Sequence, residues 1–379
     1  MALGQSLNSL IVVILILISA VISVEVSIAV PILEVLAGAI GANLFGLEFT
    51  PPFQYLSFLG LVSLMYIAGL EVDLKIMKNN LRKGGGTGVV SFFIPFIVIT
   101  LIVYFLVPPF KGEVETSVIT GIIFSVTSLA IVYPILKESG FIETEVGKVI
   151  LGSAAFSEVM GMLLVSFFFL EFSIFTLLLV IVFLISIFTL PDISKTLIKR
   201  YKDLLPEIEV RFILVLLLGI SALSEIANVE VAISAFFLGV ITSGVIKDIG
   251  ELEKKLRSLV FGFLSPFFFF EIGMEIIPQI ILPNIYLIAL LFAMSYTSKL
   301  AGNFIVAKRN MPTHARYISF LFNMPMPLGL LIAVLAHEAG MYDNALYASI
   351  IVVILISAIL SSFAIGRKRC GLDMVCDVY

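Results

Sequence analysis

The chain has 379 residues, of which 60% are hydrophobic and 13% charged, and its formal net charge at pH 7 is −4. So few polar residues cannot cover a soluble globule of this size, which excludes that class of protein and indicates the lipid bilayer as the solvent. No basic face interleaved with aromatic residues is visible, so we expect no nucleic-acid partner and take membrane lipid as the partner.

Apolar stretches near the ~20 residues needed to cross a bilayer recur along the whole chain. We predict an all-α polytopic membrane protein with about thirteen transmembrane helices, in a single membrane domain over residues 1–379 with no soluble domain. The first stretch lacks a basic leader and a cleavage pattern, so we expect it to be retained. The predicted spans are 6–24, 29–46, 54–70, 88–107, 117–136, 147–170, 173–190, 209–226, 231–246, 258–277, 284–306, 315–339 and 344–364.

Basic residues alternate with these spans, as expected if Lys and Arg collect on the cytoplasmic side. On the opposite side only Lys111 is found. The pattern predicts an N-terminus outside and a C-terminus in the cytoplasm, in the cell membrane. Cys370 and Cys376 lie in the C-terminal tail without metal-site spacing, so we interpret them as free cytoplasmic thiols. The inner loops contain Lys75, Lys78, Arg82, Lys83, Lys137, Lys148, Lys195, Lys199, Arg200, Lys202, Arg211, Lys247, Lys254, Lys255, Arg257, Lys308, Arg309 and Arg316.

A short internal repeat indicates a transporter architecture. Gly69–Val72 closes the third predicted helix and the similar Gly273–Ile276 closes the tenth, which places the two copies in opposite orientations, although so short a match also arises by chance. The fifth helix contains Thr127, Ser128 and Pro134, and the twelfth contains Asn323–Pro327. Prolines inside a helix remove amide donors, so we predict two broken helices that line a protein-enclosed or water-filled site.

Glu158 is the most informative single residue. It lies ~11 residues from the inner end of its helix, or about 16 Å, near the midplane of a ~30 Å hydrocarbon core. Burying a carboxylate there costs several kcal/mol, so it should be protonated, paired or bound to a cation. A neutral glutamic acid bonded to a neighbouring helix is the plainer alternative, but a site for a proton and a cation explains the cost better.

Lys299 lies at a similar depth, ~8 residues or about 12 Å from the inner end of its helix. It could extend along its own stem to the inner interface. Ser298 and Gly302 favour close helix packing instead. Glu271, in the outer half of the span 258–277, could line the external opening or offset Lys299 through water, and equally could hydrogen-bond another helix.

Four stretches together make the chain resemble the sodium/proton exchanger type of the cation/proton antiporter superfamily, in its second family. The resemblance implies an inverted-repeat sodium/proton antiporter fold and a homodimer. In that fold a core domain (88–170 and 283–364) moves against a dimerisation domain (1–72 and 207–278), with 171–206 as the linking helix and cytoplasmic loop. The broken helices would cross at the ion site. The stretches are Pro31–Gly38, Ala68–Asp73, Thr127–Val132 with Glu143–Gly147, and Gly273–Met274.

The resemblance also assigns site residues. The family has an acidic pair on the sixth helix, where this chain has Ser157 and Glu158, so Glu158 matches the essential carboxylate and Ser157 departs from the pattern. Lys299 matches a basic residue that pairs with the first carboxylate, which is missing here. An Arg-Gly-Glu-like run of the second broken helix is replaced by Met326–Leu328.

The expected activity is exchange of a monovalent cation for protons by alternating access. Glu158 would hold either a proton or the cation, with oxygen atoms from Thr127, Ser128 and Ser157, Asn323 as a possible accessory, and no cofactor. Because Ser157 cannot titrate, one carboxylate predicts one proton per cation and no net charge moved. Alternatively, Lys299 pairs with Glu158 and releases a proton when the cation arrives, which would make transport electrogenic.

Other functions remain open at this stage. Na⁺ is the expected cation, but the sequence does not separate it from Li⁺ or K⁺, so a K⁺/proton exchanger is an alternative. The same scaffold also hosts sodium-coupled uptake of organic anions, against which stands the lack of an intramembrane Arg to anchor the anion. A gated K⁺ efflux system would bring a regulatory soluble domain. We expect no enzyme, since no nucleophile, metal cluster or phosphate-binding glycine loop is present.

Overall fold

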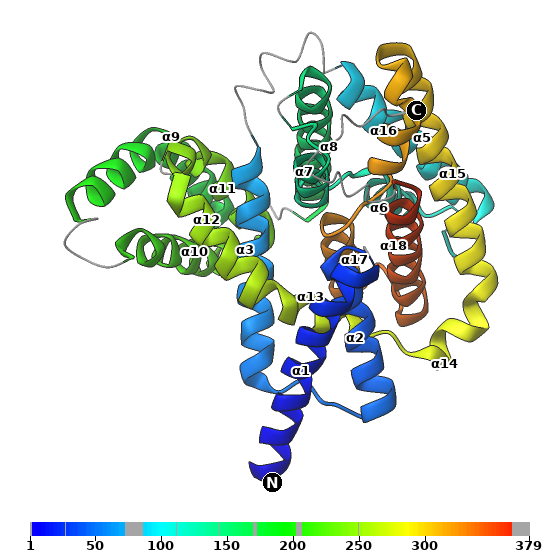
Figure 1. Cartoon of the computed structure of the whole chain (residues 1–379), viewed down its shortest axis with the longest axis horizontal. Helices are drawn as coiled ribbons and strands as arrows, with labels where there is room; N and C mark the ends of the chain where they lie inside the picture. Colours follow the sequence, from blue (N-terminus) through cyan, green and yellow to red (C-terminus); the bar gives the residue numbers. More distant parts are fainter. Residues whose placement is uncertain are drawn as a thin grey trace. The chain divides into compact units, whose positions relative to one another are not determined.

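A computed structural model describes residues 2–26, 28–72, 86–110, 112–142, 144–169, 173–201, 207–248 and 250–365. Within these ranges the chain is helical and contains no strand, which confirms the predicted all-α class (Figure 1). The predicted inner loop with Lys75 and Arg82, and the tail with Cys370 and Cys376, lie outside the described residues.

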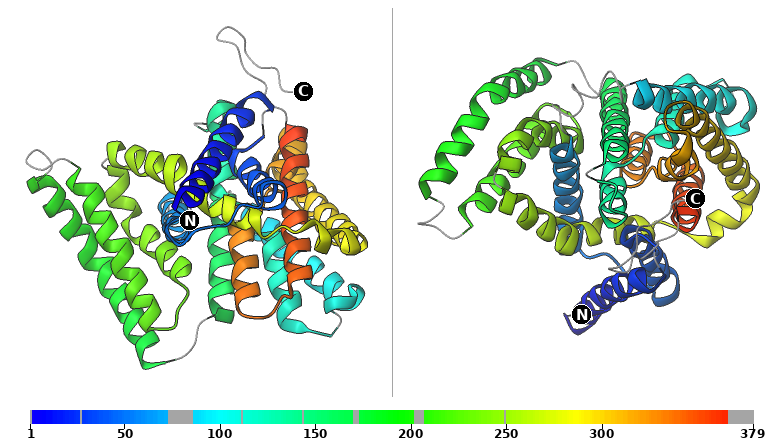
Figure 2. Two further views of the ribbon diagram at one scale, coloured as in Figure 1. Left: turned by 90° about the horizontal axis from the view of Figure 1, so that it is seen from below. Right: turned by 45° about the horizontal axis from the view of Figure 1, so that its top comes forward.

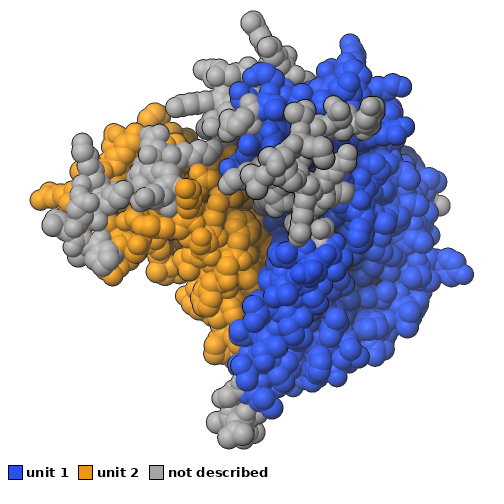
Figure 3. Space-filling model, viewed as in Figure 1, with its two compact units in different colours: residues 1–48, 74–165, 272–379 blue, residues 49–73, 166–271 orange. Residues whose placement is uncertain are grey.

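The chain forms two compact units, which are described separately (Figure 3). Unit 1 comprises residues 1–48, 74–165 and 272–379, and unit 2 comprises residues 49–73 and 166–271. The predicted division into core and dimerisation domains stays a prediction. Unit 1 contains α1 (Ala2–Val26), α2 (Val30–Phe45), α5 (Gly86–Leu106), α6 (Val114–Ser125), α7 (Leu129–Glu138), most of α8 (Glu145–Phe169), α14 (Pro278–Ile281), α15 (Ile285–Asn310), α16 (Ala315–Leu321), α17 (Leu328–Glu338) and α18 (Asn344–Ile365). Unit 2 contains α3 (Pro51–Glu71), α9 (Ile174–Tyr201), α10 (Ile208–Ile226), α11 (Val231–Asp248), α12 (Gly250–Leu259), a π-helical turn (Val260–Leu264) and most of α13 (Ser265–Met274).

Eight helical segments of the described chain are long and apolar enough to cross a membrane, and four shorter apolar helices accompany them. The count of about thirteen crossings stays a prediction. Two predicted spans are each divided: 117–136 becomes α6 and α7, and 315–339 becomes α16 and α17. Both interruptions were expected. The basic residues after α11, including Lys255 and Arg257, lie on a helix, α12, where a loop was predicted.

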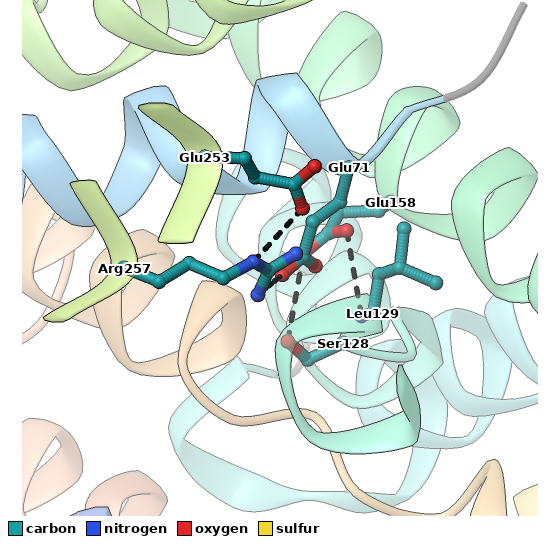
Figure 4. A network of polar contacts seen from close by, with 6 residues as sticks. All are labelled: Glu71, Ser128, Leu129, Glu158, Glu253 and Arg257. Carbon is teal, nitrogen blue, oxygen red and sulfur yellow. Dashed lines mark hydrogen bonds and ion pairs between the residues drawn. The ribbon is translucent and has the colours of Figure 1, made fainter. Parts of the chain in front are cut away.

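Ion pairs explain why this polar segment is helical. Arg257 contacts Glu253 one turn earlier at 3.0 Å and also pairs with the buried Glu71 of α3 at 2.7 Å (Figure 4). Lys255 pairs with Glu207 and Glu209 at the start of α10. Charged side chains thus connect α12 to two other helices of unit 2, which periodicity within the segment alone does not indicate.

Glycines allow the helices of unit 2 to approach closely. A Cβ atom at Gly69 of α3 would lie 2.0 Å from the carbonyl oxygen of Phe236 on α11, and one at Gly239 would lie 2.2 Å from that of Tyr66. The hydroxyl groups of Tyr66 and Thr242 hydrogen-bond across the same contact at 2.9 Å. Helices α9 and α10 also pack against α11 (Figure 2). Small residues at this contact permit van der Waals packing between backbones, the usual source of helix association in lipid.

In unit 1, buried side chains of α7, α8, α15 and α16 form one apolar cluster, which we call the inner cluster. It includes Leu129 and Val132 of α7, Ala154 and Ala155 of α8, and Ala307 of α15. Helix α6 packs against α5 and α17, and α15 packs against α5, α16 and α18. The two helix interruptions therefore lie inside a packed helical unit, as irregular backbone at membrane depth requires.

Candidate functional site

The two interruptions, residues 126–128 and 322–327, contact each other directly. The backbone N–H of Ser128 donates to the carbonyl oxygen of Met324 at 3.2 Å, and the Thr127 hydroxyl donates to that of Phe322 at 2.9 Å. Val126 is extended, with φ −63° and ψ 146°, so the helical hydrogen bonds stop there. Each broken helix thus satisfies backbone groups of the other, as expected for the predicted crossing.

Glu158 lies on α8 beside the first interruption and is 1% exposed. Its carboxylate accepts hydrogen bonds from the Ser128 hydroxyl at 3.5 Å and from the backbone N–H of Leu129 at 3.4 Å (Figure 4). Leu129 is the first residue of α7, and the N-terminus of a helix carries partial positive charge. A fixed dipole therefore supports a negative charge at Glu158.

Ser157 connects α8 to the same unwound backbone. Its hydroxyl oxygen accepts from the N–H of Thr127 at 3.1 Å, and its hydroxyl group donates to the carbonyl oxygen of Ser125 at 3.4 Å. Ser157, Thr127 and Ser128 are all buried. Four predicted site residues, Glu158 among them, are thus brought together at one break.

Lys299 of α15 is 1% exposed, and its ammonium group donates a hydrogen bond to the backbone carbonyl oxygen of Val126, the residue that follows α6. The C-terminal end of a helix carries partial negative charge, which a cation complements. The two charged side chains therefore contact opposite ends of the broken helix: Glu158 the start of α7 and Lys299 the end of α6.

The two accessory candidates lie in different surroundings. Asn323 lies in the second interruption. Its side-chain amide donates a hydrogen bond to the backbone carbonyl oxygen of Tyr296 at 3.1 Å, and its backbone carbonyl oxygen accepts one from the Ser361 hydroxyl at 3.4 Å. Asn323 also adjoins Met324, whose backbone carbonyl oxygen accepts the hydrogen bond from the N–H of Ser128. Glu271 is half-buried on α13, in the part that belongs to unit 2.

Comparison with known proteins decides the family. A family model described as "Sodium/hydrogen exchanger, transmembrane" matches residues 10–367. The chain belongs to this family. It is a multi-pass membrane protein of the sodium/hydrogen exchanger family, as the sequence motifs predicted.

Individual relatives agree with this assignment. The exchanger is 25% identical over 357 residues to a probable Na⁺/H⁺ antiporter 3 of Methanocaldococcus jannaschii, covering 89% of this chain and 88% of the relative. It is 25% identical over 333 residues to a Na⁺/H⁺ antiporter of Enterococcus hirae, covering 80% and 81%. In fold it resembles the sodium proton antiporter MjNhaP1 of M. jannaschii, with a TM-score of 0.63 at 16% identity over 96% and 95% of the chains.

Two groups at the candidate site were not found from the sequence. The N–H of Leu129 and the carbonyl oxygen of Val126 belong to the backbone, which every residue carries, so no residue type marks them.

Proposed function

We propose that this chain is a secondary active transporter that exchanges Na⁺ for protons, with Glu158 carrying one or the other. Membership of the sodium/hydrogen exchanger family supports the class of activity. The position of the Glu158 carboxylate, buried at the break between α6 and α7 and hydrogen-bonded to Leu129, is the observation that carries the assignment.

Exchange follows if one buried carboxylate can be neutralised by only one positive ion at a time. Its negative charge is too costly to leave uncompensated in a low-dielectric interior, and the hydrogen bonds from Ser128 and Leu129 offset only part of that cost. Either a proton or a cation supplies the rest. Since each neutralises the same charge, binding of one expels the other.

The surrounding oxygen atoms suit a hard cation such as Na⁺. The hydroxyl groups of Ser128, Ser157 and Thr127 would supply neutral oxygen ligands, and Asn323 lies in the adjoining interruption. Lys299 would act as a charge-compensating residue for the end of α6. With one titrating carboxylate, transport moves one proton per Na⁺ and no net charge.

The wider arrangement follows the family expectation. We propose a homodimer in the cell membrane, with the N-terminus outside, the C-terminus in the cytoplasm, and alternating access by motion of the core helices against the dimerisation helices. The transported ions are Na⁺ and H⁺, and this cycle requires no cofactor. Exchange of Li⁺ and of K⁺ should be measured beside that of Na⁺, because the three ions carry the same charge and the oxygen ligands cannot distinguish them by charge.

The test is dissipation of a preformed pH gradient in proteoliposomes when Na⁺ is added. The wild-type protein should collapse the gradient, and Glu158→Gln should not, because glutamine neither releases a proton nor neutralises a cation. Glu275→Gln is a matched control, because Glu275 also lies in unit 1 and its carboxylate accepts a hydrogen bond from the hydroxyl of Tyr347 on α18. Equal activity in wild type and Glu158→Gln would reject the assignment.

A further inference from the structure

One buried polar residue of unit 1 is unexplained by the site described above. Ser295, Lys299, Asn303 and Ala307 recur every four residues on the buried face of α15. Asn303 is 1% exposed, and within the described chain neither its amide oxygen nor its amide nitrogen has a hydrogen-bond partner. An unpartnered buried amide costs free energy, and natural proteins keep such groups where they serve a purpose.

The residues one turn before and one turn after Asn303 on α15 are both connected to the break between α6 and α7. On one side, Ala307 belongs to the inner cluster, which also contains Leu129, the residue whose N–H donates to Glu158. On the other, Val126 accepts the hydrogen bond from Lys299, and its side chain fills the space beside Gly161, where a Cβ would lie 2.3 Å from Val126 Cγ1.

Asn303 lies midway between Lys299 and Ala307 on α15. At about 1.5 Å per residue it is roughly 6 Å along the helix axis from each. A neutral amide without a hydrogen-bond partner in the described chain thus lies between one residue that contacts the end of α6 and another whose cluster includes the start of α7.

We propose that the amide oxygen of Asn303 is a ligand of the Na⁺ ion held at Glu158, an inference that rests on the proposed function. A carbonyl-type oxygen is a suitable ligand for a hard cation. Unlike a carboxylate it does not bind a proton at physiological pH. Asn303 therefore strengthens binding of the cation without strengthening binding of the competing proton, which makes it a selectivity residue.

The test compares Asn303→Leu with wild type in the proteoliposome exchange assay. The apparent KM for Na⁺ should rise roughly tenfold in the variant, which corresponds to a loss of about 1.4 kcal/mol of binding free energy. The proton concentration that half-inhibits exchange, extrapolated to zero Na⁺, should stay the same. A purely structural amide would not change these two constants selectively.

Thr100→Val is the matched control. The Thr100 hydroxyl oxygen on α5 is likewise buried without a partner in the described chain, but it lies beside Gly121, which is within α6 and before the break. This variant should keep the wild-type KM for Na⁺. If Asn303→Leu does not fold, Asn303→Ala and Na⁺-dependent thermal stabilisation of the purified protein provide the same comparison.

The outcomes separate the two proposals. If wild type exchanges Na⁺, Glu158→Gln does not, and Asn303→Leu or Asn303→Ala keeps the wild-type KM, the role of Asn303 is refuted and the proposed function stands. If wild type and Glu158→Gln are equally active, the proposed function fails and the inference about Asn303 fails with it.

Discussion

The backbone N–H of Leu129 lies 3.4 Å from Oε2 of Glu158, so the first amide of α7 faces the buried carboxylate of α8. A negative charge at a helix N-terminus gains about 0.3–1 kcal/mol, and up to ~2 kcal/mol when partly buried. Burial of the charge costs several kcal/mol. The helix dipole alone is therefore insufficient, which supports the proposal that a proton or a cation takes part in neutralising Glu158.

Ser157→Ala should destabilise the protein by about 1–3 kcal/mol, because the N–H of Thr127 loses its hydrogen-bond acceptor in a buried site. Thermal unfolding of the purified protein measures this. Ser349→Ala is the control, because the Ser349 hydroxyl donates to the carbonyl oxygen of Ala345 in its own helix, so its removal leaves no backbone N–H without an acceptor. Equal losses in both variants would show that Ser157 does not hold the interruption.

Exchange by the wild-type protein should not respond to an imposed membrane potential, because one carboxylate trades one proton for one Na⁺. Proteoliposomes with a K⁺ diffusion potential of about 100 mV provide the measurement, at which each moved charge is worth ~2.3 kcal/mol. A rate that changes with the sign of the potential would favour the alternative in which Lys299 releases a proton during the cycle.

Gly69→Ala and Gly239→Ala should each destabilise the protein by about 1–3 kcal/mol, because a methyl group at either position overlaps backbone of the facing helix. Gly219→Ala is the control within unit 2. A Cβ there meets nothing within 4 Å, so the better helix propensity of alanine should leave stability unchanged or raised by roughly 0.5–1 kcal/mol. Thermal unfolding of the three variants tests the close approach of α3 and α11.

Arg257→Met should lower the free energy of unfolding by about 3–5 kcal/mol. The reason is that the buried Glu71 carboxylate, whose side chain is 2% exposed, loses its ion pair with Arg257. Lys148→Met, which removes an exposed pair with Glu145, should change stability by no more than ~1 kcal/mol. Thermal unfolding again gives both values. A small effect of Arg257→Met would mean that α12 is held by its apolar contacts.

The sequence predicted the parts of the candidate site that depend on residue type. Glu158 was identified because a carboxylate in mid-membrane is costly, and the prolines at 325 and 327 predicted the break between α16 and α17. The break between α6 and α7 has no proline. It precedes Pro134, which lies within α7, and follows from hydrogen bonds of Thr127 and Ser128 to residues almost 200 positions away.

The remaining features depend on contacts that no local pattern encodes. Lys299 was predicted to be buried among helices, and it is, but its partner is a backbone carbonyl that is available only because α6 ends at Ser125. Asn303 stands out only because its buried amide has no hydrogen-bond partner in the described part of the chain. Glu71 pairs with Arg257 across 186 residues of sequence, and α12 forms where charge favoured a loop.

The central claim is that H⁺ and Na⁺ displace each other at one carboxylate, and proton release on Na⁺ binding measures this most directly. Purified protein in weakly buffered detergent solution would be titrated with NaCl while the pH of the solution is followed. We predict one proton released per Na⁺ bound by the wild-type protein and none by Glu158→Gln. Binding of Na⁺ to the wild-type protein without proton release would contradict the account.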